Sequence, residues 1–274
     1  MIAVLGATGT IGSHLAQLFA ERGIPARAIV RSPGERNVPL QTTGGDLLDR
    51  TSLEQALDGA SQLFLLTPHG PQQDAMERNA LAAAQAAGIE RIVKVSGGAP
   101  SLGPNGASPT SITHWYSEQR IEASGIKFQF LRPSFLMQNL LGMQLIGGVM
   151  PAPMGNGPIA MVDARDVAEC AAALLANGDA PDGAWQLTGP ASVTFSDVAR
   201  VRGVRYVSIP PRIARMALKR RGASPFEIDH SIRMARYFAS GADGSATGDV
   251  EELTGHLPRS VENFFNDQTP VKGS

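Results

Sequence analysis

Three glycines near the start of the chain have the spacing of an anion-binding turn. Gly6, Gly9 and Gly12 follow the apolar run Ile2 to Leu5, which predicts a buried parallel strand, and they precede the periodic apolar residues of a helix. Gly6 permits a tight turn, Gly9 lets the main chain approach a pyrophosphate, and Gly12 lets helix and strand pack closely. The positive end of the helix then binds the anion. An ordinary strand-to-helix loop is the alternative, but the strand starting at residue 2 and the helix end at Gly23 favour dinucleotide binding.

The end of the second predicted strand distinguishes between two dinucleotides. This strand spans Ala26 to Val30 and is followed by Arg31, with no acidic residue where a carboxylate would bind the ribose 2′-hydroxyl of NAD. Arg31 can instead pair with the 2′-phosphate of NADP, a charge-assisted contact of about 1.5 to 3 kcal/mol. We therefore expect NADP(H) to be preferred over NAD(H). The alternative for Arg31 is a solvated loop charge.

Three more strand ends bring polar residues to one edge of the predicted sheet. Asp46 and Leu47 end a short third strand, Thr67 and Pro68 follow the fourth, and Ser96 follows the fifth. Open α/β sheets bind their ligands at the carboxyl ends of the strands, so we expect these residues to contact the cofactor. For Asp46, a contact to adenine and a local turn cap are equally consistent with the sequence.

The alternation of strand and helix patterns predicts an α/β fold. We expect a right-handed, doubly wound parallel sheet of the Rossmann type, with a smaller α/β C-terminal substrate lobe. The dinucleotide-binding domain is predicted to span residues 1–140 and to be completed by residues 157–178. Residues 141–156 are predicted to be a Pro/Gly-rich linker, and residues 183–274 are predicted to form the lobe.

Local signals predict several helix starts and further elements. Thr51 and Glu54 have the spacing of a capping box, Ser111 is a candidate N-cap, and Asp166 is expected to cap a helix over Val167 to Leu175. The further elements expected are a strand at Ile159 to Val162, strands at Trp185 to Leu187 and Tyr206 to Ile209, a helix from Ser196, and three helices to the end of the chain.

The composition argues against several classes of protein. With 24 basic and 25 acidic residues, the chain has no net field to attract nucleic acid or anionic lipid. No apolar run is long enough to span a bilayer, and the single Cys170 rules out an internal disulfide framework. The five histidines are scattered, without metal-ligand spacing. The strand at residue 2 leaves no room for a signal peptide, so we expect a cytoplasmic protein without metal, nucleic acid or membrane, either monomer or homodimer.

Together these motifs resemble the NmrA-like family of atypical short-chain dehydrogenase/reductases. The matching segments are the glycine turn and residues 29–31, 45–47, 124–133, 162–168, 187–190 and 253–255, in the family's order. The resemblance implies NADP(H) along the carboxyl edge of the sheet and a cleft for a small-molecule acceptor between the lobes. The cofactor contacts implied are Gly6, Thr8, Gly9, Thr10, Ile11, Gly12, Arg31, Asp46, Leu47, Thr67, Pro68, Ser96, His114, Pro133 and Phe135. Phe135, Met137 and Asn139 would line the acceptor cleft, the alternative being ordinary core positions.

The resemblance also exposes a missing catalytic pair. Typical short-chain dehydrogenases pass a proton through a tyrosine whose pKa is lowered by a lysine four residues later. Counting back from Arg132, those two positions hold Thr110 and His114, followed by Glu118. Tyr116 with Arg120 has the right spacing but lies six residues out of register. His114 is the candidate catalytic residue, oriented by Glu118 on the same helical face, and a merely helix-stabilising pair is the alternative.

Without a general acid, the chemistry narrows to acceptors that form stabilised products. Hydride addition to a simple ketone yields a strongly basic alkoxide, whereas a quinone or cationic dye yields a phenolate or a neutral product that water can protonate. The sequence therefore predicts an NADPH-dependent oxidoreductase of conjugated acceptors such as quinones or dyes. The alternative is a non-catalytic NADP(H)-sensing regulator that binds a protein partner, which the resemblance also allows.

Overall fold

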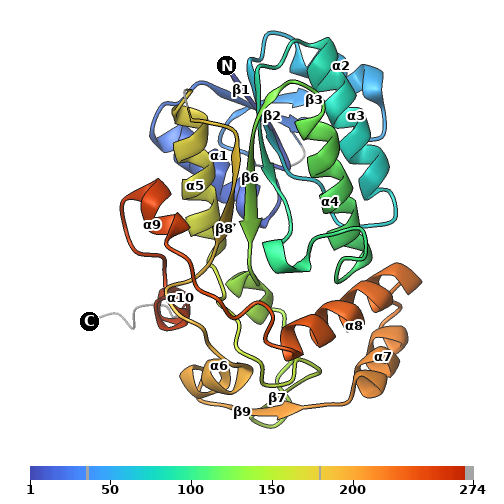
Figure 1. Ribbon diagram of the computed structural model, residues 1–274, viewed down its shortest axis with the longest axis vertical. Helices are drawn as coiled ribbons and strands as arrows, with labels where there is room; N and C mark the ends of the chain where they lie inside the picture. The colour runs from blue at the N-terminus through green and yellow to red at the C-terminus, as the bar shows by residue number, and fades with distance from the viewer. Residues whose placement is uncertain (35–36, 179, 269–274) are drawn as a thin grey trace.

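A seven-stranded parallel sheet forms the centre of the computed structural model, which describes residues 1–34, 37–178 and 180–268 (Figure 1). The strand order is β3-β2-β1-β4-β5-β6-β8, so the chain reverses its direction of travel across the sheet between β1 and β4. This reversal confirms the predicted doubly wound sheet and creates a crevice at its carboxyl edge. The strands are β1 (Ile2–Leu5), β2 (Ala26–Val30), β3 (Gln41–Gly44), β4 (Gln62–Leu65), β5 (Arg91–Val95), β6 (Lys127–Pro133) and β8 (Gly183–Leu187).

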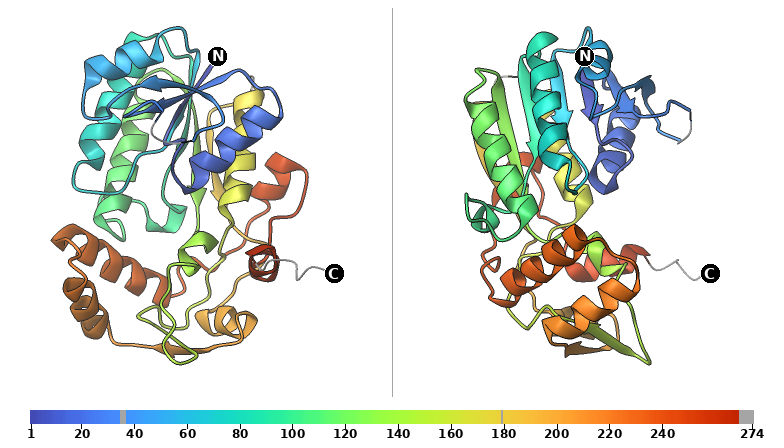
Figure 2. Two further views of the ribbon diagram at one scale, coloured as in Figure 1. Left: turned by 180° about the vertical axis from the view of Figure 1, so that it is seen from behind. Right: turned by 90° about the vertical axis from the view of Figure 1, so that its right-hand side faces the viewer.

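Helices cover both faces of the sheet, because successive strand residues point to opposite sides. In β1, Ile2 and Val4 belong to the core shared with α1 and α5, whereas Ala3 and Leu5 belong to the core shared with α2, α3 and α4. The left view of Figure 2 shows helices on both sides of the sheet. The helices are α1 (Thr10–Glu21), α2 (Arg50–Leu57), α3 (Gln73–Ala86), α4 (Pro109–Glu122) and α5 (Ala164–Ala176).

A smaller lobe lies beyond the carboxyl edge of the sheet (Figure 1). Its two-stranded sheet pairs β7 (Val149–Ala152) in parallel with β9 (Arg205–Ser208), and Phe135, Met137, Phe195 and Phe238 are in its core. The remaining elements are the short helices η1 (Ala99–Ser101) and η2 (Met137–Leu140), with α6 (Phe195–Val201), α7 (Pro211–Arg220), α8 (Pro225–Ala239), α9 (Asp249–Thr254) and α10 (Val261–Gln268).

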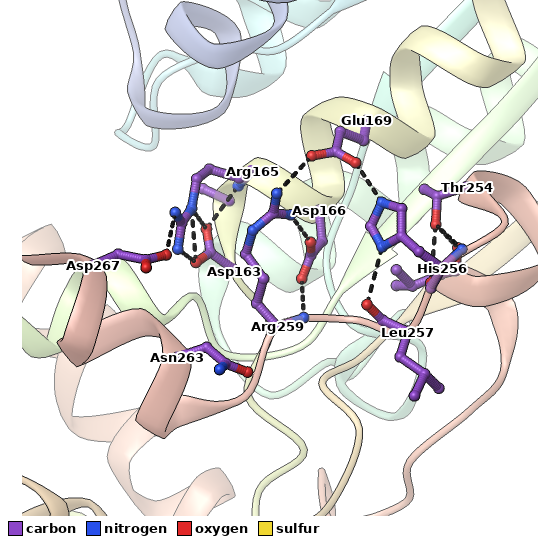
Figure 3. Close-up of polar contacts among 12 residues, drawn as sticks. Asp163, Arg165, Asp166, Glu169, Thr254, His256, Leu257, Arg259, Asn263 and Asp267 are labelled. Carbon is purple, nitrogen blue, oxygen red and sulfur yellow. Dashed lines mark hydrogen bonds and ion pairs between the residues drawn. The ribbon is translucent and has the colours of Figure 1, made fainter.

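Polar contacts fasten the C-terminal segment to the start of α5 (Figure 3). Arg259 contacts both Asp166 and Glu169, and its main-chain N–H donates to Asp166 at 2.8 Å. Burial raises the pKa of Asp166 although Arg259 opposes the shift. Arg165 joins Asp163 to Asp267 of α10, with 2.6 Å to each carboxylate. These ion pairs hold α10 and the segment before it beside α5.

Three predicted helix starts are wrong by two or three residues, because an earlier side chain already caps the helix. Asp49 caps α2 by accepting from Ser52 N, and the predicted capping box of Thr51 and Glu54 is absent, since Glu54 pairs with Arg50. In α4 the N-cap is Ser108, not Ser111, and Pro109 takes the first turn, where its missing N–H costs nothing. In α5 the N-cap is Asp163, and Asp166 forms an ion pair with Arg259.

The C-terminal half differs from the expectation in strand placement. Trp185 to Leu187, expected in the lobe, belongs to β8 at the edge of the large sheet, where it pairs with β6. The expected linker contains β7, and Ile159 to Val162 forms isolated bridges in place of a strand. Four helices, not three, follow β9 in the described residues. The division into domains at 140 and 183 stays a prediction.

Candidate cofactor and acceptor site

The glycine turn between β1 and α1 is shaped by main-chain contacts that exclude side chains. Gly6 has a φ of +83°, and a Cβ at Gly12 would lie 2.1 Å from the Gly6 carbonyl oxygen. At Gly9 the corresponding distance is 3.3 Å. Gly9 is the N-cap of α1 and offers no side chain to the first N–H groups of the helix. Those N–H groups therefore remain available to an anion.

A cavity of about 780 Å³ opens from this turn along the carboxyl edge of the sheet. Ten of the predicted cofactor-contacting residues line it: Gly6, Thr8, Gly9, Thr10, Ile11, Arg31, Asp46, Leu47, Thr67 and Pro68. Sequence reasoning missed Leu66, Gln72, Met76 and Leu136 on the same wall. Gly12 supports the turn from behind and is not part of the wall.

Arg31 and Asp46 lie at the β2 and β3 end of the cavity. Arg31 is exposed, and no hydrogen bond or ion pair to a described residue engages its guanidinium. The carboxylate of Asp46 accepts from Leu48 N at 2.9 Å, so it is a local turn cap that also faces the cavity. Both interpretations of Asp46 from the sequence are therefore compatible with its position.

Behind Thr67, a buried ion pair underlies the cavity wall. The Thr67 hydroxyl donates to Glu77 Oε1 at 2.8 Å, and Lys94 Nζ donates to the same oxygen at 2.8 Å. Neither Glu77 nor Lys94 has any exposed side-chain surface. Burial alone would raise the pKa of Glu77, but the Lys94 ammonium overcomes this effect and lowers the pKa to about 2. A lysine within the apolar strand Arg91–Val95 is the sequence signal that could have identified this pair.

His114 belongs to this buried network and does not line the cavity. Lys94 has no acceptor atom, so its ammonium donates to His114 Nδ1, 3.2 Å away. The proton of the neutral ring then lies on Nε2, 3.3 Å from Gln73 Nε2, and because both of these nitrogens are donors they do not bond to each other. Burial first, and the Lys94 charge second, hold the pKa of His114 well below its ordinary value. Because Nδ1 accepts from Lys94 and the residue is only 3% exposed, the predicted catalytic and ribose contacts do not match the observed position.

Glu118 does not orient His114, contrary to the expectation. Its carboxylate pairs with Arg132 through two hydrogen bonds of 2.6 and 3.1 Å, because β6 carries that guanidinium against the inner face of α4. Thr110, in the tyrosine position, is buried and its hydroxyl contacts no described partner. Tyr116 is exposed, with Arg120 6.0 Å from its ring centroid.

The residues after β5 and β6 occupy different surroundings from those predicted. Ser96 is buried and its hydroxyl has no partner among the described residues. Phe135 and Met137 lie in the lobe core, and Phe135 makes edge-to-face contacts with Phe195 and Phe238. Neither Phe135 nor the final β6 residue, Pro133, is on the cavity wall, to which this segment contributes Leu136. Asn139 is exposed. A contact of Phe135, Met137 or Asn139 with an acceptor stays a prediction.

In the described part of the chain, no three His, Cys, Asp or Glu side chains are arranged to hold a metal ion, and no helix is long and apolar enough to cross a membrane.

Comparison with known proteins agrees with this geometry. Residues 6–178 match the model of a family described as NAD(P)H-binding. The chain is 35% identical to an NAD(P)H azoreductase of Xenophilus azovorans and 33% identical to a (4-alkanoyl-5-oxo-2,5-dihydrofuran-3-yl)methyl phosphate reductase of Streptomyces griseus, each over 96% of both chains. A similar fold occurs in an NADPH-dependent quinone oxidoreductase of Escherichia coli complexed with NADPH (TM-score 0.87, 24% identity, 98% and 99% coverage). It also occurs in the Citrobacter triphenylmethane reductase complexed with NADP(H) (TM-score 0.84, 20% identity, 97% and 99% coverage).

Proposed function

The chain belongs to the NAD(P)H-binding family, and on that premise we propose that it is an NADPH-dependent reductase of flat, conjugated acceptors such as quinones and dyes. The resemblance to NmrA-like short-chain dehydrogenase/reductases agrees with this membership. When bound, the cofactor would supply the hydride. The protein's own residues would bind the cofactor, orient it against the acceptor and exclude part of the water from the site.

The residues present fit a dinucleotide. The main chain at Gly6, Gly9 and Gly12 leaves a cradle that added Cβ atoms would fill or distort, and the uncapped start of α1 faces it. Thr8 and Thr10 bring hydroxyls to the same wall, where phosphate oxygens can accept from them. The guanidinium of Arg31, which no described residue engages, lies at the far end and supports a preference for NADP(H), because a 2′-phosphate would complete its hydrogen bonding.

The proposed class of acceptor rests on which residues stand at the positions of the usual catalytic tyrosine and lysine. Thr110 and His114 are both buried, and the nitrogens of His114 already face Lys94 and Gln73. Neither residue can deliver a proton to an alkoxide as it forms. An acceptor whose reduced form is a stabilised phenolate or a neutral amine does not require such a donor. The azoreductase name of the 35%-identical relative supports a conjugated dye as the acceptor.

The proposal is tested by following NADPH oxidation with one quinone, one azo dye, one triphenylmethane dye and one simple ketone under identical conditions. We expect turnover with the conjugated acceptors and none with the ketone. Equal rates with the ketone would contradict acid-free hydride transfer. Tight NADPH binding with no turnover on any acceptor would favour the NADP(H)-sensing regulator.

A further inference from the structure

Three imidazole rings meet where the sheet approaches α8 of the smaller lobe. His69 directly follows the cavity residue Pro68, His114 lies on α4, and His230 lies on α8. The ring centroid of His69 is 5.7 Å from that of His114 and 5.5 Å from that of His230, with interplanar angles of 71° and 61°. The rings therefore form a row from the buried Lys94 network to the smaller lobe.

The three rings differ in their hydrogen bonding. Nδ1 of His114 accepts from Lys94, whereas no hydrogen bond from a described residue reaches the side chain of His69. Nδ1 of His230 is enclosed and has no partner among the described residues. Buried polar atoms are rarely left unpaired in folded proteins, so this nitrogen indicates a missing ligand or water. The parallel ring of Phe226, 6.3 Å from that of His230, places an aromatic surface beside it.

The surroundings of both outer imidazoles lower their pKa and so favour the neutral rings. Although His69 is exposed, the protein around its ring, then the neighbouring His230 and Lys94, lower its pKa, against the opposing charge of Glu77. Burial lowers the pKa of His230, with Asp229 opposing the shift. A neutral imidazole presents one N–H donor and one acceptor nitrogen, and can therefore donate a hydrogen bond without bringing a positive charge.

We propose that His69 and His230 are the acceptor-binding pair, which donates hydrogen bonds to a carbonyl oxygen or azo nitrogen of a flat aromatic acceptor packed against Phe226. This assignment rests on the proposed reductase function, and it moves the acceptor from the predicted Phe135, Met137 and Asn139 to the junction with α8. Negative charge develops on the acceptor heteroatom as it takes up hydride from NADPH, and neutral N–H donors aimed at that atom stabilise it. One proton from water completes the reduction, and both imidazoles keep their own protons.

The test measures binding of an azo dye to the protein loaded with NADP⁺, in which no hydride is available. His69→Phe and His230→Phe keep a ring and remove the N–H groups. We expect each to weaken dye binding about three- to tenfold, the worth of one net hydrogen bond, with unchanged NADPH affinity. His230→Asn places an amide near the former Nδ1 and is expected to restore most of the affinity. His14→Phe, on α1, is the matched control with wild-type dye binding.

The outcomes separate this inference from the proposed function. Unchanged dye binding in both phenylalanine variants, or no dye binding by the wild-type protein, overturns the acceptor-binding pair. Weakened dye binding with rescue by His230→Asn supports the pair even if the wild-type protein reduces no dye, a result that would instead contradict the reductase activity. If a phenylalanine variant fails to fold, the dye affinities of His69→Gln and His230→Asn are measured in its place. The wild-type protein is also tested with two dyes, one with and one without a hydrogen-bond acceptor. Equal affinity for these two dyes overturns the pair.

Discussion

Lys94 Nζ lies 2.8 Å from Glu77 Oε1, and neither side chain has any exposed surface. The lysine is on a central strand and the glutamate on α3, so the pair joins the sheet to the helix that covers it. Thr67 on the cavity wall donates to the same carboxylate oxygen. The ion pair therefore supports the cavity from within the core.

Lys94→Met should destabilise the protein strongly. It leaves the Glu77 carboxylate buried without its counter-charge, and breaking a buried pair in this way costs about 3 to 5 kcal/mol. The double variant Lys94→Met/Glu77→Gln should recover part of the loss, because no charge is then left buried. Urea denaturation followed by circular dichroism measures both. A single variant as stable as the wild type would show that the pair contributes nothing.

Acid should destabilise the protein through Glu77. Its folded-state pKa is lowered to about 2 from an ordinary value of 4.5, so the unfolded chain takes up the proton first. This contribution to the free energy of unfolding is complete above about pH 4.5 and is lost as the pH falls through about 2. The measurement is the unfolding free energy between these pH values. Lys94→Met/Glu77→Gln, which lacks the carboxylate, should show a shallower decline.

Arg31→Ala should weaken NADPH binding and leave NADH binding nearly unchanged. Loss of a charge-assisted contact to the 2′-phosphate costs about 1.5 to 3 kcal/mol, roughly tenfold to a hundredfold in affinity. Titration calorimetry with both dinucleotides makes the comparison. Arg31→Lys keeps the charge without the planar guanidinium, so its NADPH affinity should fall between those of the wild type and Arg31→Ala. Equal losses for NADPH and NADH would remove the assignment of Arg31 to the 2′-phosphate.

Gly12→Ala should damage the fold more than Gly9→Ala. The added Cβ would lie 2.1 Å from the Gly6 carbonyl oxygen at position 12 but 3.3 Å at position 9, and main chain cannot move aside as a side chain can. We expect a clear drop in melting temperature for Gly12→Ala. Gly9→Ala should melt close to the wild type and lose NADPH affinity, since its methyl group would enter the anion-binding turn. The reverse order of melting temperatures would contradict this account.

His114→Ala should lower stability and leave turnover largely intact. Removal of the ring takes one acceptor from Lys94, which keeps its pair with Glu77, at a cost of about 1 to 3 kcal/mol. Loss of a proton-transferring residue would instead lower kcat roughly a hundredfold or more. Melting temperature and kcat with a quinone, measured on the same preparation, separate the two roles. A hundredfold fall in kcat at unchanged melting temperature would restore His114 as the catalytic residue.

The sequence alone was sufficient for the features that depend on neighbouring residues. The strand, glycine turn and helix at residues 2–21 follow from apolar spacing and from the need for residues without Cβ, and the alternation of elements was enough to predict the parallel sheet. Arg31 and Thr67 could be placed at the cavity because parallel strands all end at one edge. Helix caps were less predictable, since Thr51 and Asp49 both satisfy the local rule and only the folded main chain selects one.

Only the tertiary structure decided which side chains meet across the core. Helical spacing predicts a contact between His114 and Glu118. In the structure α4 packs against β6, where Glu118 pairs with Arg132. His114 instead contacts Lys94 of β5. Phe135 was expected on a cavity wall and lies in the lobe core, because the small sheet of β7 and β9 and the α6 and α8 helices enclose it. His69 and His230 approach each other only after α8 folds back toward the sheet. Contacts between residues distant in the chain depend on how whole elements pack, which local periodicity does not encode.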